Sequence, residues 1–155
     1  MAQKILLLLS TCIMGVFLGT QLAEAVLIVP YWKELSSDAF FELHKTYGKR
    51  LYQFYAPLTI ASIILPTITF FYSLLGKSKT DILLWVMFIS AIMFFSTYFI
   101  YFKEANISFA EQTITNEALS KELIRWGNWH WTRVLCEAIA FVCGLILLLK
   151  TKWKS

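Results

Sequence analysis

Four long apolar stretches constrain this chain more than any other feature of its sequence. They are Ile5–Val29, Leu51–Leu75, Ile82–Phe102 and Trp129–Leu149. Each is long enough to cross the hydrocarbon core of a bilayer, which takes about 20 apolar residues in a helix. In lipid the backbone satisfies its hydrogen bonds only in helices or closed barrels, and the sequence shows no short alternating barrel segments. The chain is therefore predicted to be an all-α integral membrane four-helix bundle, with residues 1–155 as a single domain.

The composition agrees with a membrane location. Hydrophobic residues make up 58% of the chain and charged residues 15%, whereas a soluble domain carries about 25% charged residues. The net charge of +4 does not indicate nucleic-acid binding, because the basic residues form no basic helix and the aromatic residues lie in apolar runs. The three cysteines form no CxxC motif, so we expect buried free thiols. The expected partner is a lipid bilayer, with no nucleic acid.

The distribution of lysine residues favours one orientation. With four spans both termini lie on the same side, and six lysines flank the membrane there in short segments. They are Lys4, Lys77, Lys79, Lys150, Lys152 and Lys154. We therefore expect both termini to be cytoplasmic, in the cytoplasmic membrane if the source is bacterial. A signal peptide ending at Ala23-Glu24-Ala25 is the alternative for the first stretch, but the apolar run continues to Val29.

Capping residues predict that the second and fourth helices extend beyond the membrane on the outer side. Ser36 or Ser37 can cap a helix that runs into the second span, and Thr115 or Asn116 can cap one that runs into the fourth. On the other side, residues 76–81 are predicted to form a tight hairpin, with Thr80 or Asp81 as the cap of the third helix.

Two helix faces carry small or hydroxyl side chains. On the first helix Gly15, Gly19 and Ala23 are spaced four apart, which lets another helix approach closely. Packing within one chain is the simpler interpretation, and a homo-oligomer contact is the alternative. The second helix has a face that forms either a packing seam or the wall of a polar cavity. Its members are Tyr52, Tyr55, Thr59, Ser62, Pro66, Thr69 and Ser73.

The fourth helix carries the main candidate residues on one face. They are Trp126, His130, Arg133, Glu137, Ala140 and Gly144, with the polar members in the outer half. A charge near the bilayer centre costs about 2.5–3.5 kcal/mol on insertion scales. Glu24 of the first helix lies at a matching depth, so we expect a carboxylate within salt-bridge reach of Arg133. A buried ion pair that fixes helix register and a polar pocket both remain open interpretations.

The histidines do not form a recognisable metal or haem pattern. His44 and His130 are the only two in the chain, both are expected on the outer side, and no HxxxH or ExxH spacing occurs. We therefore expect no cofactor and no metal.

Several short motifs resemble one membrane family. Trp126-x3-His130-x2-Arg133 precedes the apolar run Ala138–Leu149, and Asn106 follows the third span. Gly15 and Gly19 precede Val29-Pro30 and then Phe40-Phe41-x2-His44. Together these residues resemble the anthrone oxygenase-like integral membrane family, much of which is a domain of unknown function. The resemblance implies four spans and, from its characterised members, oxygenation of polycyclic phenolic anthrones without a cofactor.

The residues themselves are compatible with such chemistry. A phenol that has lost its proton can react with oxygen, so the protein must supply a base, a cation and an apolar slot. His130, with an ordinary imidazole pKa of about 6.5, can act as the base, and Arg133 can stabilise the phenolate. Glu24 or Glu137 can orient His130 or balance Arg133. The predicted substrate contacts are Trp126, Trp129, Tyr52, Tyr55, His44 and Asn106. The competing hypothesis is a non-enzymatic scaffold, or a subunit that binds or transports a small molecule.

Overall fold

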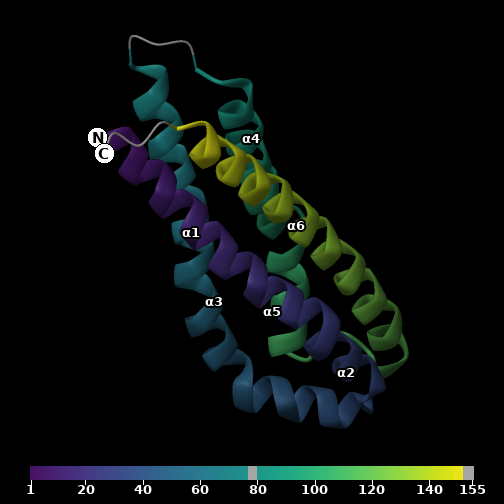
Figure 1. The fold of residues 1–155 in the computed structure, drawn as a ribbon. Coiled ribbons are helices and arrows are strands. Elements are labelled where there is room, and N and C mark those ends of the chain that lie inside the picture. Colours follow the sequence, from purple (N-terminus) through teal and green to yellow (C-terminus); the bar gives the residue numbers. More distant parts are fainter. Residues whose placement is uncertain (77–79, 152–155) are drawn as a thin grey trace.

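The structure, a computed structural model, describes residues 1–76 and 80–151 and contains only helices in that part of the chain. Four helical stretches are long and apolar enough to cross a membrane: Ala2–Glu34, Ser37–Leu74, Ile82–Ala110 and Asn116–Lys150. They run side by side, and the start of the first and the end of the last lie at the same end of the bundle (Figure 1). The predicted all-α membrane bundle is confirmed. We call the opposite end the outer end.

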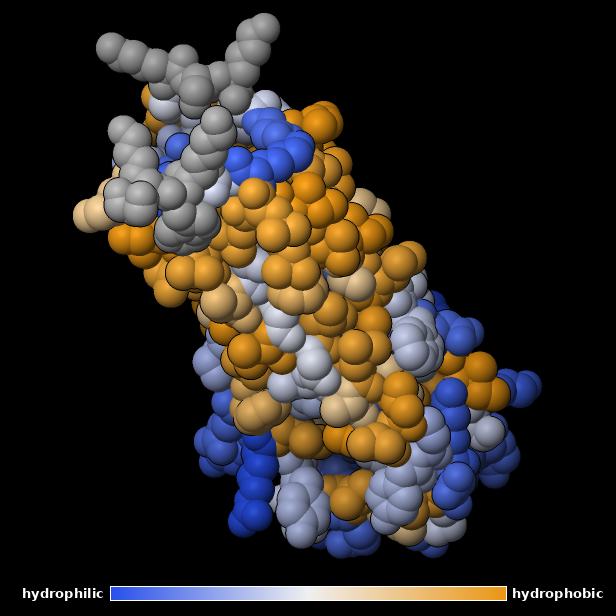
Figure 2. All heavy atoms as spheres, in the orientation of Figure 1, coloured by the Kyte–Doolittle hydropathy of each residue, from blue (hydrophilic) through white to orange (hydrophobic). Residues whose placement is uncertain are grey.

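A broad apolar belt crosses the middle of the face of the molecule shown in Figure 2. In Figure 2 hydrophobic side chains cover this belt, and hydrophilic side chains gather at the outer end, which is the lower end in that view. Such a belt is the surface that a hydrocarbon core requires. The lysines Lys77, Lys79, Lys152 and Lys154, on which the predicted orientation partly depends, lie outside the described residues.

The first span is one helix with a wider turn inside it. Helix α1 (Ala2–Ala23) continues into a π-helical segment, η1 (Glu24–Ile28), and then into α2 (Val29–Glu34). Pro30 lies in the first turn of α2, directly after the π-helical segment; it removes one backbone N–H donor, but the helix continues past the predicted end at Val29.

The second span, α3 (Ser37–Leu74), begins far outside its apolar stretch. Ser36 caps it, since its hydroxyl oxygen accepts a hydrogen bond from the N–H of Ala39 at 3.3 Å. In Figure 1 the first part of α3 bends sharply and lies across the outer end of the bundle. Pro57 and Pro66 each remove one backbone hydrogen bond within this helix.

The third span comprises α4 (Ile82–Thr97), a second π-helical segment, η2 (Tyr98–Phe102), and α5 (Lys103–Ala110). Asp81 caps α4, because its carboxylate accepts a hydrogen bond from the N–H of Leu83 at 2.9 Å. The helix passes the predicted end at Phe102 because the segment after Lys103 still buries apolar side chains, including Phe109, in the outer core.

The fourth span, α6 (Asn116–Lys150), packs closely against α1. A methyl group added at Gly144 would lie 2.6 Å from the Thr11 hydroxyl, and one at Gly15 would lie 2.7 Å from the Phe141 ring. Gly15 therefore packs within the chain. Gly19 and Ala23 are exposed, and nothing lies within 4 Å of a methyl group placed at Gly19.

The hydroxyl face of α3 is a packing seam along its inner half. The hydroxyls of Ser10 and Thr69 are 2.7 Å apart, and Gln3 donates a hydrogen bond to the hydroxyl of Ser73 at 3.0 Å. Tyr52, at the outer end of that face, is 67% exposed and joins neither the seam nor the site. These contacts hold α1 against α3 in the half of the bundle that contains the start of α1.

Candidate functional site

A layer of polar side chains crosses the bundle between its apolar clusters. We call it the polar layer and define it by Gln21, Glu24, Tyr55, His130, Arg133 and Glu137. Helix α1 and η1 supply the first two, α3 supplies Tyr55, and α6 supplies the last three. Rows of aromatic side chains lie on its outer side, and the Phe17–Phe94–Cys136 cluster borders it on the inner side. The structure therefore brings together residues that the sequence separates by more than a hundred positions.

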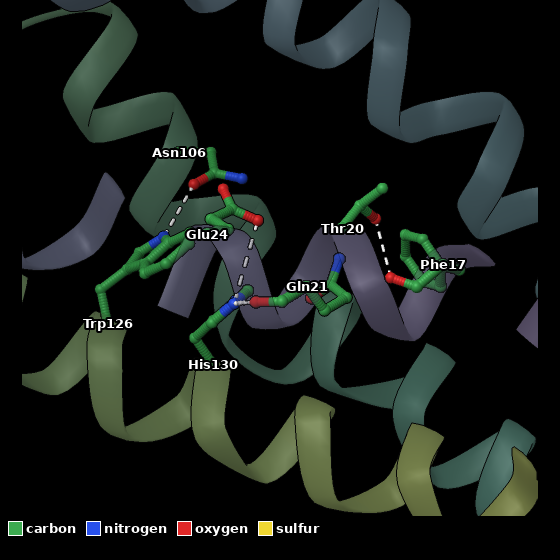
Figure 3. Close-up of polar contacts among 7 residues, drawn as sticks. All are labelled: Phe17, Thr20, Gln21, Glu24, Asn106, Trp126 and His130. Atoms are coloured by element: carbon green, nitrogen blue, oxygen red, sulfur yellow. Dashed lines mark hydrogen bonds and ion pairs between the residues drawn. The ribbon is translucent and has the colours of Figure 1, made fainter. Parts of the chain in front are cut away.

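His130 is held in one orientation at the centre of this layer. Its Nε2 donates a hydrogen bond to the backbone oxygen of Gln21 at 2.9 Å, because a carbonyl can only accept. The Oε2 atom of Glu24 lies 3.9 Å from the same nitrogen (Figure 3). The Trp126 ring stacks on the imidazole at a centroid distance of 5.0 Å. A proton on Nε2 leaves Nδ1 of a neutral imidazole with a free lone pair.

Arg133 lies between aromatic rings. Its guanidinium carbon is 4.9 Å from the centre of the Phe94 ring and 4.7 Å from that of Phe102. The predicted salt bridge is wrong, since no ion pair within 4.0 Å joins Arg133 to a carboxylate in residues 1–76 and 80–151. Glu24 and Glu137 interact with it over a longer distance. The ring faces take the place of the expected carboxylate, through a cation–π contact.

The polar layer contains an unusual number of unpaired groups. Within the described part of the chain, the buried side-chain atoms without a hydrogen-bond partner belong to Gln21, His130, Arg133, Glu137 and Ser62. All but Ser62 are members of the layer. Both oxygens of Glu137 and both polar atoms of the Gln21 side chain are among them. Buried polar groups are normally hydrogen-bonded, so these atoms are donors and acceptors with which a polar ligand or water can form hydrogen bonds.

The remaining candidate residues lie farther out. Trp126 links the polar layer to the third span, because its indole N–H donates to the Asn106 side chain at 3.1 Å (Figure 3). Trp129 stacks on Tyr101 instead, with ring centroids 5.4 Å apart. His44 packs edge-on against Trp32 and Phe109 of the outer core, and no ring contact joins it to His130 in the described residues.

Three residues of the site escaped the sequence analysis. Gln21 lies three positions before Glu24, a helical spacing that would have placed both on one face of the first helix. Phe94 and Phe102 are ordinary members of an apolar span, and nothing in their spacing identifies them as neighbours of a guanidinium. Only the way in which the helices pack reveals that role.

Four members of the polar layer are buried, Gln21, Glu24, His130 and Glu137, whereas Tyr55 and Arg133 are partly exposed. His130 and Glu137 are both 0% exposed. Two surface clefts lie elsewhere, one at the outer end beside α5 and one at the opposite end beside Gln3. In the described residues no group of three or more His, Cys, Asp or Glu side chains is arranged to hold a metal ion.

No family model matches the chain, and no curated protein or solved structure matches it significantly.

Proposed function

We propose that the polar layer binds the hydroxyl-bearing end of a lipophilic phenolic molecule and that the protein oxygenates it without a cofactor. The observation that carries this proposal is the set of unpaired buried atoms around His130. Nδ1 of His130 can accept a phenolic proton, and the Nε of Arg133 can donate a hydrogen bond to the phenolate that results. The resemblance of the Trp126–Arg133 motif to the anthrone oxygenase-like family selects the substrate class.

The proposed reaction balances without a further reductant. An anthrone loses the proton of its enol form to Nδ1 of His130, and the anion reacts with O₂ at the ring carbon opposite the oxygen. That carbon changes from CH₂ to C=O. One oxygen atom enters the quinone, the other leaves as water, and O₂ takes up the four electrons. The protein supplies a base, a cation and an apolar enclosure.

Because His130 is fully buried, the substrate needs an opening between helices to reach it. An opening through the apolar belt would face lipid, where a polycyclic phenol partitions (Figure 2). Trp126 and Phe102, whose ring centroids are 5.1 Å apart, cover the layer on its outer side. Movement of these rings would expose His130 and Arg133 to the bilayer without breaking a backbone hydrogen bond.

The test uses purified protein in nanodiscs, incubated with anthrone and oxygen while quinone absorbance is followed. His130→Gln removes the base and should lower the rate about 100-fold or more, the usual contribution of a general base. Arg133→Gln should also lose activity, whereas Arg50→Gln, an exposed arginine near the outer end, serves as the matched control. Helix content and gel filtration establish that each variant is folded.

A non-enzymatic scaffold is the second candidate, favoured by the complete burial of His130. Anaerobic binding of a non-oxidisable phenol, measured by equilibrium dialysis, separates the two. Binding that depends on Arg133 but no turnover would indicate a binding protein. The absence of both binding and turnover with several phenols would favour the scaffold hypothesis, in which the polar layer fixes the register of the helices.

We also propose that the end carrying Lys4 and Lys150 faces the cytoplasm. These lysines lie beside the apolar belt, where basic residues favour the cytoplasmic side. Lys4→Cys and Glu111→Cys, treated in intact cells with a membrane-impermeant maleimide, test the orientation. Labelling of Glu111→Cys alone is expected, and labelling of Lys4→Cys alone would reverse it.

A further inference from the structure

The outer end of the bundle carries a cleft that is separate from the polar layer. It has a volume of about 370 Å³, within the range of small-molecule sites, roughly 300–1,000 Å³. Its walls come from the end of the third span, with Ile100, Tyr101 and Glu104, and from the start of α6, with Glu122 and Arg125. Residues 113 and 114 of the connecting turn border it. We call it the outer cleft.

Two charged groups of the outer cleft, those of Glu122 and Arg125, are held by neighbouring side chains, and a third, that of Glu104, faces solvent. Tyr101 donates a hydrogen bond to Oε1 of Glu122 at 2.6 Å, and Arg125 lies over the Tyr101 ring at 5.0 Å. Arg125 also lies 4.0 Å from Oε2 of Glu122, and 65% of its side chain is exposed. Glu104 is exposed and forms no ion pair within 4.0 Å in the described part of the chain. The cleft thus offers two carboxylates and one guanidinium, of which Glu122 and Arg125 are held by contacts with Tyr101 and with each other.

The outer cleft has the kind of aromatic neighbours that concentrate at the depth of lipid headgroups. Tyr101 and Trp129, which stack on each other, lie at the outer ends of the apolar stretches Ile82–Phe102 and Trp129–Leu149. Tyrosine and tryptophan concentrate at this level of a membrane, where one side of the ring is apolar and the other is wet. Ile100, next to the cleft, is 67% exposed. An acyl chain can therefore follow the apolar belt while its headgroup enters the cleft.

We propose that the outer cleft binds a phospholipid whose headgroup carries a primary ammonium group, of the phosphatidylethanolamine type. The ammonium group donates hydrogen bonds to the carboxylates of Glu104 and Glu122. The phosphate accepts from the guanidinium of Arg125, which suits phosphate oxygens geometrically. The two carboxylates and one guanidinium match the one cation and one anion of the headgroup, with an acid in excess.

The arrangement discriminates among phospholipids by chemistry. A choline headgroup keeps the positive charge but has no N–H donor for the carboxylates. A glycerol headgroup brings only the anionic phosphate into a cleft with two carboxylates. The proposed order of affinity is therefore ethanolamine first, choline second and glycerol last. Binding at this cleft is independent of the oxygenase proposal, because none of its charged groups belongs to the polar layer.

The experiment is native mass spectrometry of the full chain with equimolar ethanolamine, choline and glycerol phospholipids of identical acyl chains. Glu104→Gln should weaken binding of the ethanolamine lipid about fivefold, as for an exposed ion pair at the upper end of its usual contribution. Stepwise methylation of the ethanolamine nitrogen should weaken it progressively. Arg125→Gln should weaken binding of all three lipids, and Glu117→Gln, an exposed acid outside the cleft, is the matched control.

Soluble phosphoethanolamine separates a lipid from a free headgroup as the ligand. The lipid proposal expects weak competition, because the soluble molecule lacks acyl chains to lie along Ile100 and the apolar belt. Equal competition by soluble phosphoethanolamine would overturn the assignment to a lipid. Equal retention of the three lipids, or retention unchanged in Glu104→Gln, would overturn the site itself.

Discussion

Replacing Gly144 with alanine tests the contact between α1 and α6. The added methyl carbon would lie 2.6 Å from the hydroxyl oxygen of Thr11 and 3.2 Å from its methyl group. Thr11 is 2% exposed, and its hydroxyl donates to the backbone oxygen of Leu7 at 2.8 Å. The side chain cannot rotate away without losing that hydrogen bond, so the two helices must separate slightly.

The magnitude follows from two opposing terms. Inserting a methyl group into a packed core costs about 1–3 kcal/mol, whereas alanine is favoured over glycine inside a helix by about 0.8–1.0 kcal/mol. Gly144→Ala should therefore lower the free energy of unfolding by roughly 0–2 kcal/mol. Gly19 lies on α1 with open space around it, so Gly19→Ala should be stabilised by the higher helix propensity of alanine, without a packing cost. The difference between the two variants isolates the packing cost, about 1–3 kcal/mol.

Reversible unfolding in mixed micelles by increasing the proportion of sodium dodecyl sulfate measures both variants under identical conditions. Circular dichroism follows helix content, and gel filtration of the folded state identifies any change in association. Equal stability of the two variants would refute the reasoning, since it would mean that α1 and α6 do not approach closely at Gly144. A loss of stability in Gly19→Ala would place a partner against the exposed part of α1.

Two further predictions concern polar contacts. A double-mutant cycle of Ser10→Ala and Thr69→Ala should give a coupling of about 0.5–1.5 kcal/mol for their 2.7 Å hydrogen bond, and no coupling in the same unfolding assay would contradict that bond. The N–H of Leu83 and then the ammonium of Lys150 hold the pKa of Asp81 below its usual value, so its contribution to stability is present at neutral pH and disappears as the pH falls through that lowered value. Asp81→Asn should therefore be less stable than the wild type at pH 7 but equal to it in strong acid, and an equal difference at both pH values would exclude the carboxylate's charge as the cause.

Much of the fold was predictable because membrane insertion imposes strong local rules. A charged or polar stretch ends a span, so four apolar runs predicted four helices. Local rules also identified two caps, since the side chains of Ser36 and Asp81 accept hydrogen bonds at the starts of α3 and α4. Thr115, at the N-cap position of α6, forms no such hydrogen bond. The rules misplaced two helix ends, at Val29 and at Phe102, because a proline or a charged residue ends the apolar run there without ending the helix.

The composition of the site was more predictable than its geometry. The cost of burying a charge correctly placed Glu24 and Glu137 in the interior. The same argument failed for Arg133, because Coulomb attraction suggested a carboxylate partner while the structure gives it two phenyl rings. Whether an arginine pairs with an acid or with rings depends on how neighbouring spans are rotated about their axes. That rotation depends on contacts between distant residues, and no local pattern records it.

The two π-helical segments have a consequence for chain length. Each π turn holds one residue more than an α turn, because its hydrogen bond reaches one residue farther along the chain. Removing one residue from Glu24–Ile28 or Tyr98–Phe102 can restore an ordinary α-helical turn. The side chains before and after that turn then still point toward the same neighbouring helices. A deletion elsewhere would turn every later residue by about 100° about the axis. Related chains can therefore differ by one residue within these segments and still superimpose at both ends of the span.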